Sequence, residues 1–392
     1  MKNNEILLEV IGDADDALIP ETDAPTRKHF PTKFALIAAA CAVLALCVAL
    51  LPLRSAFKNN PSVYEGLPCS ADFDPRTGKE KFCTAPNFGS MGFEGLMAYN
   101  ISELDNASPW SGTTDTLPVF RNLAYSEENA EAETYGNLSA EQLKSIARNT
   151  AAALDTSIIS TDTEQYSGIL HSLNAKCKDD ITITVYGDGQ ICISFEKSVA
   201  LPRKYSFTND RTTDSQAEAA LEYLSRKYAA ALGFRSPVCY SYADRSFTGE
   251  QIRSYCMYEY SADEVRSLLN HSLASVRFCP DDNGALMCIW IDNAFCSSEY
   301  IGNYGIIDET KAKKLLLNGE YYSSVPSNFL KEGKITADAV AKCELVYRNI
   351  KSEAFFQPYY RFYVELDPNS LNMADGLKNF GIFYVSALSL NE

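Results

Sequence analysis

Histidine is scarce, with three residues in a chain of 392. Histidine is the side chain most often used as a general base near neutral pH. Only His171 and His271 lie beyond the first 53 residues, and each begins a His-Ser-Leu triplet near a predicted helix end. We interpret both as helix-terminal residues, so the sequence offers no catalytic histidine.

The common catalytic motifs are also missing. The chain has no Gly-x-Ser-x-Gly elbow, no His-Glu-x-x-His and no glycine-rich phosphate loop ending in Lys-Ser/Thr. The Ser-x-x-Lys match at Ser55–Lys58 lacks the companion motifs of penicillin-binding enzymes. Asp281 to Gly284 fit a hairpin turn, because the alternating ligands and closing Glu of a calcium loop do not follow. We therefore predict no catalytic residue, no metal and no cofactor.

The chain lacks an excess of positive charge. It has 35 Lys and Arg against 51 Asp and Glu, a net charge of −16. Binding to nucleic acid depends on neutralising phosphates with Lys and Arg. We therefore exclude nucleic acid as a partner, and the same argument disfavours anionic lipid.

No Cys-x-x-Cys pair occurs among the twelve cysteines, so their spacing gives no disulfide framework. Ten of them lie after the longest apolar run, and an even number in an exported domain permits disulfides. Cys69 and Cys83 are the pair we predict first, because they bracket a loop that a covalent link would stabilise. Free buried thiols are the alternative.

One long apolar run is present, over residues 34–53. Twenty helical residues span roughly the 30 Å hydrocarbon core of a bilayer. A cleaved signal peptide has a shorter apolar stretch after a basic start, whereas this run follows an acidic segment of 33 residues. A buried core helix is the other alternative. We predict a single transmembrane helix.

Flanking charge and domain size suggest the orientation. Arg27, Lys28 and Lys33 precede the run, and Arg54 and Lys58 follow it. Positive flanks tend to stay inside, and only the part after the run is long enough for a substantial core. We expect a cell-membrane protein with an acidic cytoplasmic tail (1–33) and an extracytoplasmic part, comprising an irregular lead-in (54–136) and a folded domain (137–392).

The patterning of the folded domain predicts an α+β fold with antiparallel β-hairpins and packed helices. Two hairpins turn at Gly189 and Gly284, and each is followed by a helix, which suggests repeat units over about 175–270 and 271–392. The predicted helices cover residues 139–154, 215–232, 261–271 and 309–317. Their predicted N-terminal signals are the capping box of Ser139 and Gln142, Asp214, the Ser261-x-x-Glu264 pattern and Asp308. The predicted strands cover 181–186, 191–195, 275–279, 286–291, 358–366 and 380–385.

The strand at 358–366 carries a candidate binding face. Alternation places Tyr359, Arg361 and Tyr363 on one side. Tyrosine and arginine are favoured at binding hot spots, so an open face here would bind a peptide or a glycan. Core packing beneath a helix is the alternative interpretation.

Several segments together resemble uncharacterised membrane-anchored proteins of clostridial Gram-positive bacteria. The resemblance is carried by GDADDALIP at 12–20, YNISELDNASPW at 99–110, LPVFRN at 117–122, YGIIDETKAKKLLLNGEYYSSVP at 304–326, ELVYRNI at 344–350, PYYRFYVEL at 358–366 and FGIFYVSAL at 380–388. The segment 304–326 is also weakly similar to PepSY-like modules and to outer domains of regulators of cell-wall sensor kinases. The resemblance implies architecture and topology, without an activity.

The leading functional hypothesis is therefore a non-enzymatic sensor or regulator that binds an envelope ligand or protein. Residues 1–20 would dock on a cytoplasmic or membrane partner, and residues 34–53 would hold the chain in the membrane. A passive scaffold is the alternative, and a hydrolase would need converging carboxylates with shifted pKa values.

Overall fold

The computed structural model describes residues 86, 88, 92–126, 135–166 and 168–389. The chain divides into two units, 1–59 and 60–392, and every described residue belongs to the second. The tail (1–33), the apolar run (34–53) and the Cys69–Cys83 pair lie outside the described residues. None of the helices in the described ranges is long and apolar enough to cross a bilayer.

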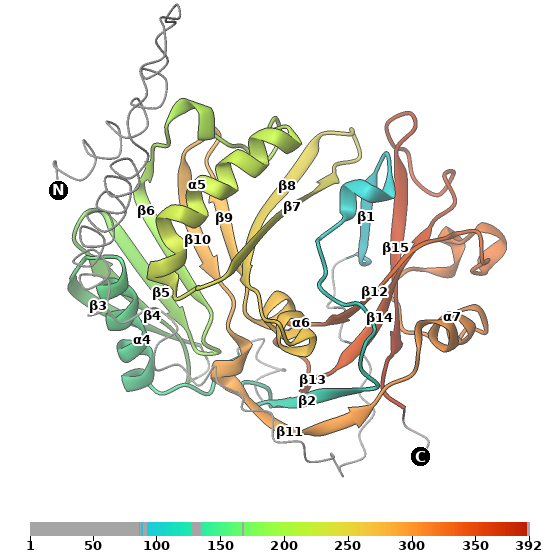
Figure 1. Ribbon diagram of the computed structural model, residues 1–392, viewed down its shortest axis with the longest axis horizontal. Helices are drawn as coiled ribbons and strands as arrows, with labels where there is room; N and C mark the ends of the chain where they lie inside the picture. The colour runs from blue at the N-terminus through green and yellow to red at the C-terminus, as the bar shows by residue number, and fades with distance from the viewer. Residues whose placement is uncertain (1–85, 87, 89–91, 127–134, 167, 390–392) are drawn as a thin grey trace, which may run out of the picture. The chain divides into compact units, whose positions relative to one another are not determined.

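The described part is α+β, with four α-helices and three sheets whose paired strands are antiparallel, as the sequence predicts (Figure 1). The largest sheet has eight strands. Their order is β3 (Ile158–Tyr166), β4 (Ile169–Cys177), β5 (Ile181–Tyr186), β6 (Ile191–Val199), β10 (Leu286–Ile291), β9 (Val276–Pro280), β8 (Gln251–Glu259) and β7 (Pro237–Arg245).

This sheet consists of two four-stranded meanders joined edge to edge. β3 to β6 form one and β7 to β10 the other, and β6 pairs with β10 through Ile193 opposite Ile289. A helix precedes each meander: α4 (Ala140–Ala153) comes before β3 and α5 (Asp214–Leu232) before β7. The predicted hairpins at Gly189 and Gly284 thus occupy corresponding places. A helix follows each hairpin along the chain as predicted, α5 after β6 and α7 (Glu309–Leu317) after β10, with β11 (Ser298–Gly305) between β10 and α7.

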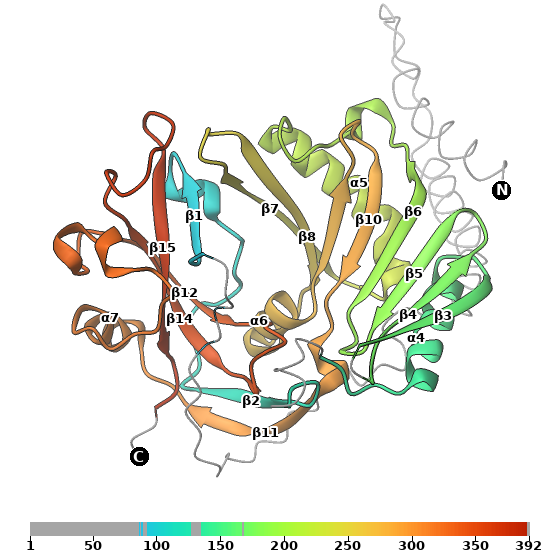
Figure 2. The same cartoon turned by 180° about the vertical axis from the view of Figure 1, so that it is seen from behind.

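α4 and α5 cover one face of the eight-stranded sheet, and their apolar sides join one core with its inward residues (Figure 2). α4 begins with the predicted capping box of Ser139 and Gln142. α5 is capped by Thr213 and not by the predicted Asp214, because the Thr213 hydroxyl accepts the Gln216 N–H. It ends at Gly233, whose φ of 89° suits a residue without a side chain.

α6 (Glu264–Leu273) is inserted between β8 and β9 and contacts both β8 and β12 (Val340–Tyr347). The predicted start at Ser261 is wrong, because the Asp263 carboxylate caps the helix by accepting the Val265 N–H. α6 contributes Leu268, Leu269 and Leu273 to a second core.

The second core lies against two smaller sheets. The four-stranded sheet has the order β1 (Gly95–Ala98), β15 (Lys378–Ser386), β14 (Pro358–Glu365), β12, and the three-stranded sheet has the order β11 (Ser298–Gly305), β2 (Thr116–Asn122), β13 (Phe355–Phe356). The remaining helix is α7 (Glu309–Leu317), which contacts β15.

Residues 92–126 differ from the predicted irregular lead-in. They contain β1 and β2, which pair with strands far along the chain, β15 and β11. Such pairing is made by backbone N–H and C=O groups and needs little local sequence pattern. A short strand completing the edge of a distant sheet is therefore hard to find from its own residues.

Phe362 on β14 is fully buried in the second core. We expect Phe362→Ala to lower the free energy of unfolding by about 3–5 kcal/mol, because it removes a large apolar side chain and leaves a cavity. Ile159→Ala is the control, since this side chain is 68% exposed, and its effect should stay within about 0.5 kcal/mol. Urea denaturation measures both, and equal effects would contradict this packing.

Candidate functional site

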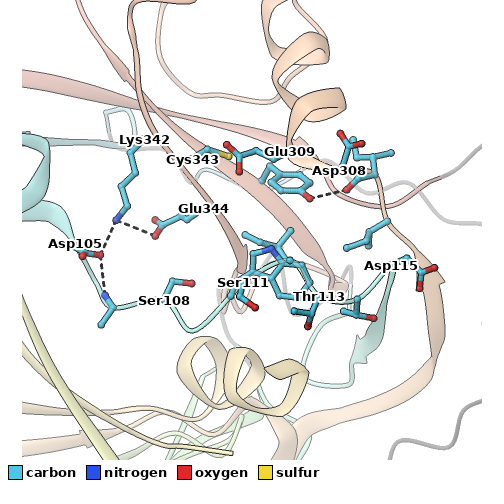
Figure 3. A pocket seen from close by; sticks show the side chains of 18 residues that line it. Asp105, Ser108, Ser111, Thr113, Asp115, Asp308, Glu309, Lys342, Cys343 and Glu344 are labelled. Atoms are coloured by element: carbon cyan, nitrogen blue, oxygen red, sulfur yellow. Dashed lines mark hydrogen bonds and ion pairs between the residues drawn. The ribbon is translucent and has the colours of Figure 1, made fainter. Parts of the chain in front are cut away.

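A cavity of about 880 Å³ lies between residues 105–115, β12 and the start of α7 (Figure 3). Its volume falls within the range of typical small-ligand pockets. Most of its lining is polar, and its walls come from segments separated by more than 200 positions in the chain. The fold therefore creates the site by bringing together segments that are far apart in the sequence.

Residues 108–115 form one wall, which we call the strap. The Glu264 carboxylate on α6 fastens it by accepting hydrogen bonds from the backbone N–H groups of Ser111, Gly112 and Thr113 and from the Thr113 hydroxyl. The bonds from Gly112 and Thr113 N–H measure 3.1 and 3.3 Å. Together these hydrogen bonds outweigh the desolvation of the carboxyl and lower the pKa of Glu264.

Glu344 on β12 lies opposite Arg361 on β14 and forms another part of the cavity wall. Its Oε1 accepts hydrogen bonds from Arg361 Nε at 2.7 Å and from the Tyr363 hydroxyl at 2.5 Å. Lys342 Nζ lies 3.4 Å from the second oxygen, Oε2. The Glu344 side chain is only 5% exposed, so its charge depends on these partners.

The same carboxylate also contacts Asn106, which precedes the strap, and Asn106 in turn contacts α6. Asn106, oriented as its neighbours require, donates to Glu344 Oε2 at 3.0 Å and accepts from Arg361 at 2.9 Å. The Asn106 carbonyl lies 2.8 Å from His271 Nε2. The His271 ring stacks on Tyr240 with centroids 5.0 Å apart, and burial lowers its pKa. His271 is therefore neutral at pH 7 and links α6 to this network.

Glu344 is held ionised. Burial alone would raise the pKa of its carboxyl, but the positive charges of Arg361 and Lys342 and the hydrogen bond from Tyr363 outweigh burial and lower it. A general acid needs the opposite shift. Glu344 thus serves as a fixed negative charge in the wall.

The cavity carries more negative than positive charge. Five carboxylates line it, with one amine, that of Lys342, which also pairs with Asp105 at 3.4 Å. One carboxylate oxygen of Asp308, Oδ1, already accepts a hydrogen bond from the Lys311 N–H at 2.7 Å, because Asp308 caps α7. The remaining lining carboxylates belong to Asp115 and Glu309. The arrangement suits a ligand that carries amines or other hydrogen-bond donors.

The sequence-predicted face at Tyr359, Arg361 and Tyr363 is closed in the structure. Tyr359 and Tyr363 are each 1% exposed and pack in a cluster with Ala98 and Leu104. Opposite them on β14, alternate residues enter the second core, so both faces of this strand are covered. Arg361 is the exception, with its side chain 25% exposed. A binding role for the three remains a prediction.

Sequence reasoning missed the strap, Lys342 and Glu344. The run of Ser, Gly and Thr between Trp110 and Asp115 was a signal for an exposed loop. Nothing local indicated that Glu344 would lie opposite Arg361, because strand register depends on the whole sheet.

Within the described ranges, no group of three or more His, Cys, Asp or Glu residues could hold a metal ion. Comparison with known proteins gave no match to any family model or to any curated protein.

We expect Glu344→Gln to lower the free energy of unfolding by about 3–5 kcal/mol, because it leaves Arg361 without its counter-charge in a mostly buried place. Adding Arg361→Met should recover part of the loss, since the uncompensated charge is then gone. Chemical denaturation at pH 7 measures both variants. A loss below about 1 kcal/mol in the single variant would show that the pair behaves as a surface ion pair.

Acidification should bring the stabilities of wild type and Glu344→Gln closer together. A carboxyl with a lower pKa in the folded than in the unfolded chain adds stability above its ordinary value of 4.5 and loses it as pH falls through the folded value. The stability difference between the two proteins should therefore shrink below pH 4.5. Denaturation curves across this window test it, and a constant difference would contradict the shift.

Proposed function

We propose that this chain is a membrane-anchored extracytoplasmic sensor or regulator that binds an envelope ligand in the strap cavity. The observation that carries the proposal is the cavity of about 880 Å³, one wall of which is fastened to α6 through the Glu264 carboxylate. Residues 34–53 anchor the chain, and residues 1–20 engage a cytoplasmic or membrane partner.

The strap offers a way to register a ligand. It lines the cavity on one side and is fastened to Glu264 on the other. α6, which bears Glu264, contacts β8 of the large sheet and β12 of the four-stranded sheet. A ligand that shifts the strap would therefore act on the helix that packs against both sheets.

Ligand chemistry follows from the lining. The excess of carboxylates favours an amine-bearing ligand such as a basic peptide or an aminated envelope component. The ionised state of Glu344 supports binding over hydrolysis, because no proton is available there for a leaving group.

Protease shaving of intact cells tests the orientation, with tags at Met1 and Glu392. We expect loss of the Glu392 tag and survival of the Met1 tag, because the folded domain lies outside in this proposal. Shaving of lysed cells is the control and should remove both tags. The reverse pattern would place the domain inside and would contradict envelope sensing.

Deletion of residues 1–20 tests the role of the tail. In the correctly oriented protein, this deletion should abolish the transcriptional response to cell-wall inhibitors. An unchanged response would show that the tail takes no part in signalling.

A further inference from the structure

A second surface lies on the face of the eight-stranded sheet opposite α4 and α5. Val185, Ile289 and Ile291 are fully buried in the helix-covered core. Neighbouring strand residues point to opposite faces, so Tyr186 and Trp290 lie on the other side. Both rings are half-buried and stacked, with centroids 5.8 Å apart and planes 16° from parallel.

The stack extends into a row of four rings, which we call the aromatic row: Tyr166, His171, Tyr186 and Trp290. His171 lies 5.6 Å from Tyr186 and 4.8 Å from Tyr166, both edge to face. Tyr166 is 52% exposed and His171 is partly exposed. The row crosses β3, β4, β5 and β10, so a rigid sheet fixes the spacing of the rings.

A small cavity of about 210 Å³ adjoins the row. Lys351, in its lining, places its Nζ 5.1 Å from the Tyr186 ring centroid and 2.7 Å from Asp188. Gln190 donates to Asp292 at 2.6 Å in the same lining. Arg277, which also lines the cavity, lies opposite Trp290 in the strand register. Lys351 thus connects the lining of this cavity with the aromatic row.

We propose that the aromatic row and this cavity bind a saccharide chain. The C–H face of a sugar ring packs on an aromatic face, whose electron density is negative, and steps of about 5–6 Å between rings are comparable to the length of one hexose unit. Hydroxyl and acetamido groups both donate and accept, and they match the mixed amide, carboxylate and cationic groups of the cavity. A nucleic acid, which would also stack, is opposed by the net charge of −16. This surface is distinct from the strap cavity, and the inference stands without it.

The chain provides its own reporter, because it contains two tryptophans, Trp110 and Trp290. Trp110 lines the strap cavity and Trp290 belongs to the aromatic row. In the full-length Trp110→Phe protein, the tetramer of β-1,4-linked N-acetylglucosamine and cellotetraose are each titrated while Trp290 emission is followed. We expect a saturable change with at least one of them, and the preferred sugar distinguishes an acetamido-bearing chain from a neutral glucan.

Variants locate the binding. Gln190→Ala and Asp292→Asn, each in the Trp110→Phe protein, should weaken binding by about tenfold or more. The first removes an amide from the cavity wall, and the second replaces a charged acceptor by a neutral amide. Tyr260→Ala is a control at an aromatic residue outside both the row and the cavity: its side chain is 52% exposed, and this variant should bind as before. Thermal unfolding followed by circular dichroism confirms that each variant is folded.

Three outcomes would overturn the inference. The first is no saturable signal by fluorescence or calorimetry with either sugar. The second is an equal loss of affinity in Tyr260→Ala. The third is a response of Trp110 in the Trp290→Phe protein with none from Trp290, which would assign the sugar to the strap cavity and leave the proposed function intact.

Discussion

The ion pair between Glu344 and Arg361 joins two neighbouring strands of the four-stranded sheet, and the packing of residues 105–106 and α6 against that sheet depends on it. Glu344 is 5% exposed, and a charge so placed requires a counter-charge and hydrogen bonds. Arg361 and Tyr363 supply them from β14, and Asn106 supplies one from the segment before the strap. One carboxylate thus connects β12 and β14 with two segments far away in the sequence, the one that holds Asn106 and, through His271, α6.

Local patterns were sufficient for part of this architecture. The capping box at Ser139 predicted α4, and the alternation on either side of Gly189 predicted β5 and β6, because these signals lie within a few residues of one another. The same reasoning placed α7 after Asp308. The α+β class followed from these elements.

Other features depended on distant partners. The burial pattern of β7 is intermediate at almost every position, so no strict alternation announces it. Tyr359 and Tyr363 looked like an exposed binding face because β14 carries polar and aromatic residues on that side. In the structure, Ala98 on β1 and Leu104 just after it cover these tyrosines. This packing follows from the pairing of β1 with β15, two strands that lie far apart in the sequence. The strap cavity was missed for the same reason.

The two-meander sheet explains why one domain presents two unlike surfaces. Joining β6 to β10 edge to edge gives a sheet broad enough for two helices on one face. On the other face, α6 occupies the β8 half, where His271 packs on Tyr258, and the aromatic row lies across the other half. Because α6 is inserted between β8 and β9, the two meanders differ on this face of the sheet. One half of the face packs against α6, and the other half carries the aromatic row.

The way Glu264 holds the strap has a consequence for how this protein can diversify. Three of the four groups that the carboxylate binds are main-chain amides, at Ser111, Gly112 and Thr113. Main-chain donors persist whatever side chain a position bears, with proline as the exception. Substitutions along the strap can thus alter the chemistry of the cavity while the strap stays attached to α6. The ligand preference of the cavity can therefore change without a change in how the strap is held.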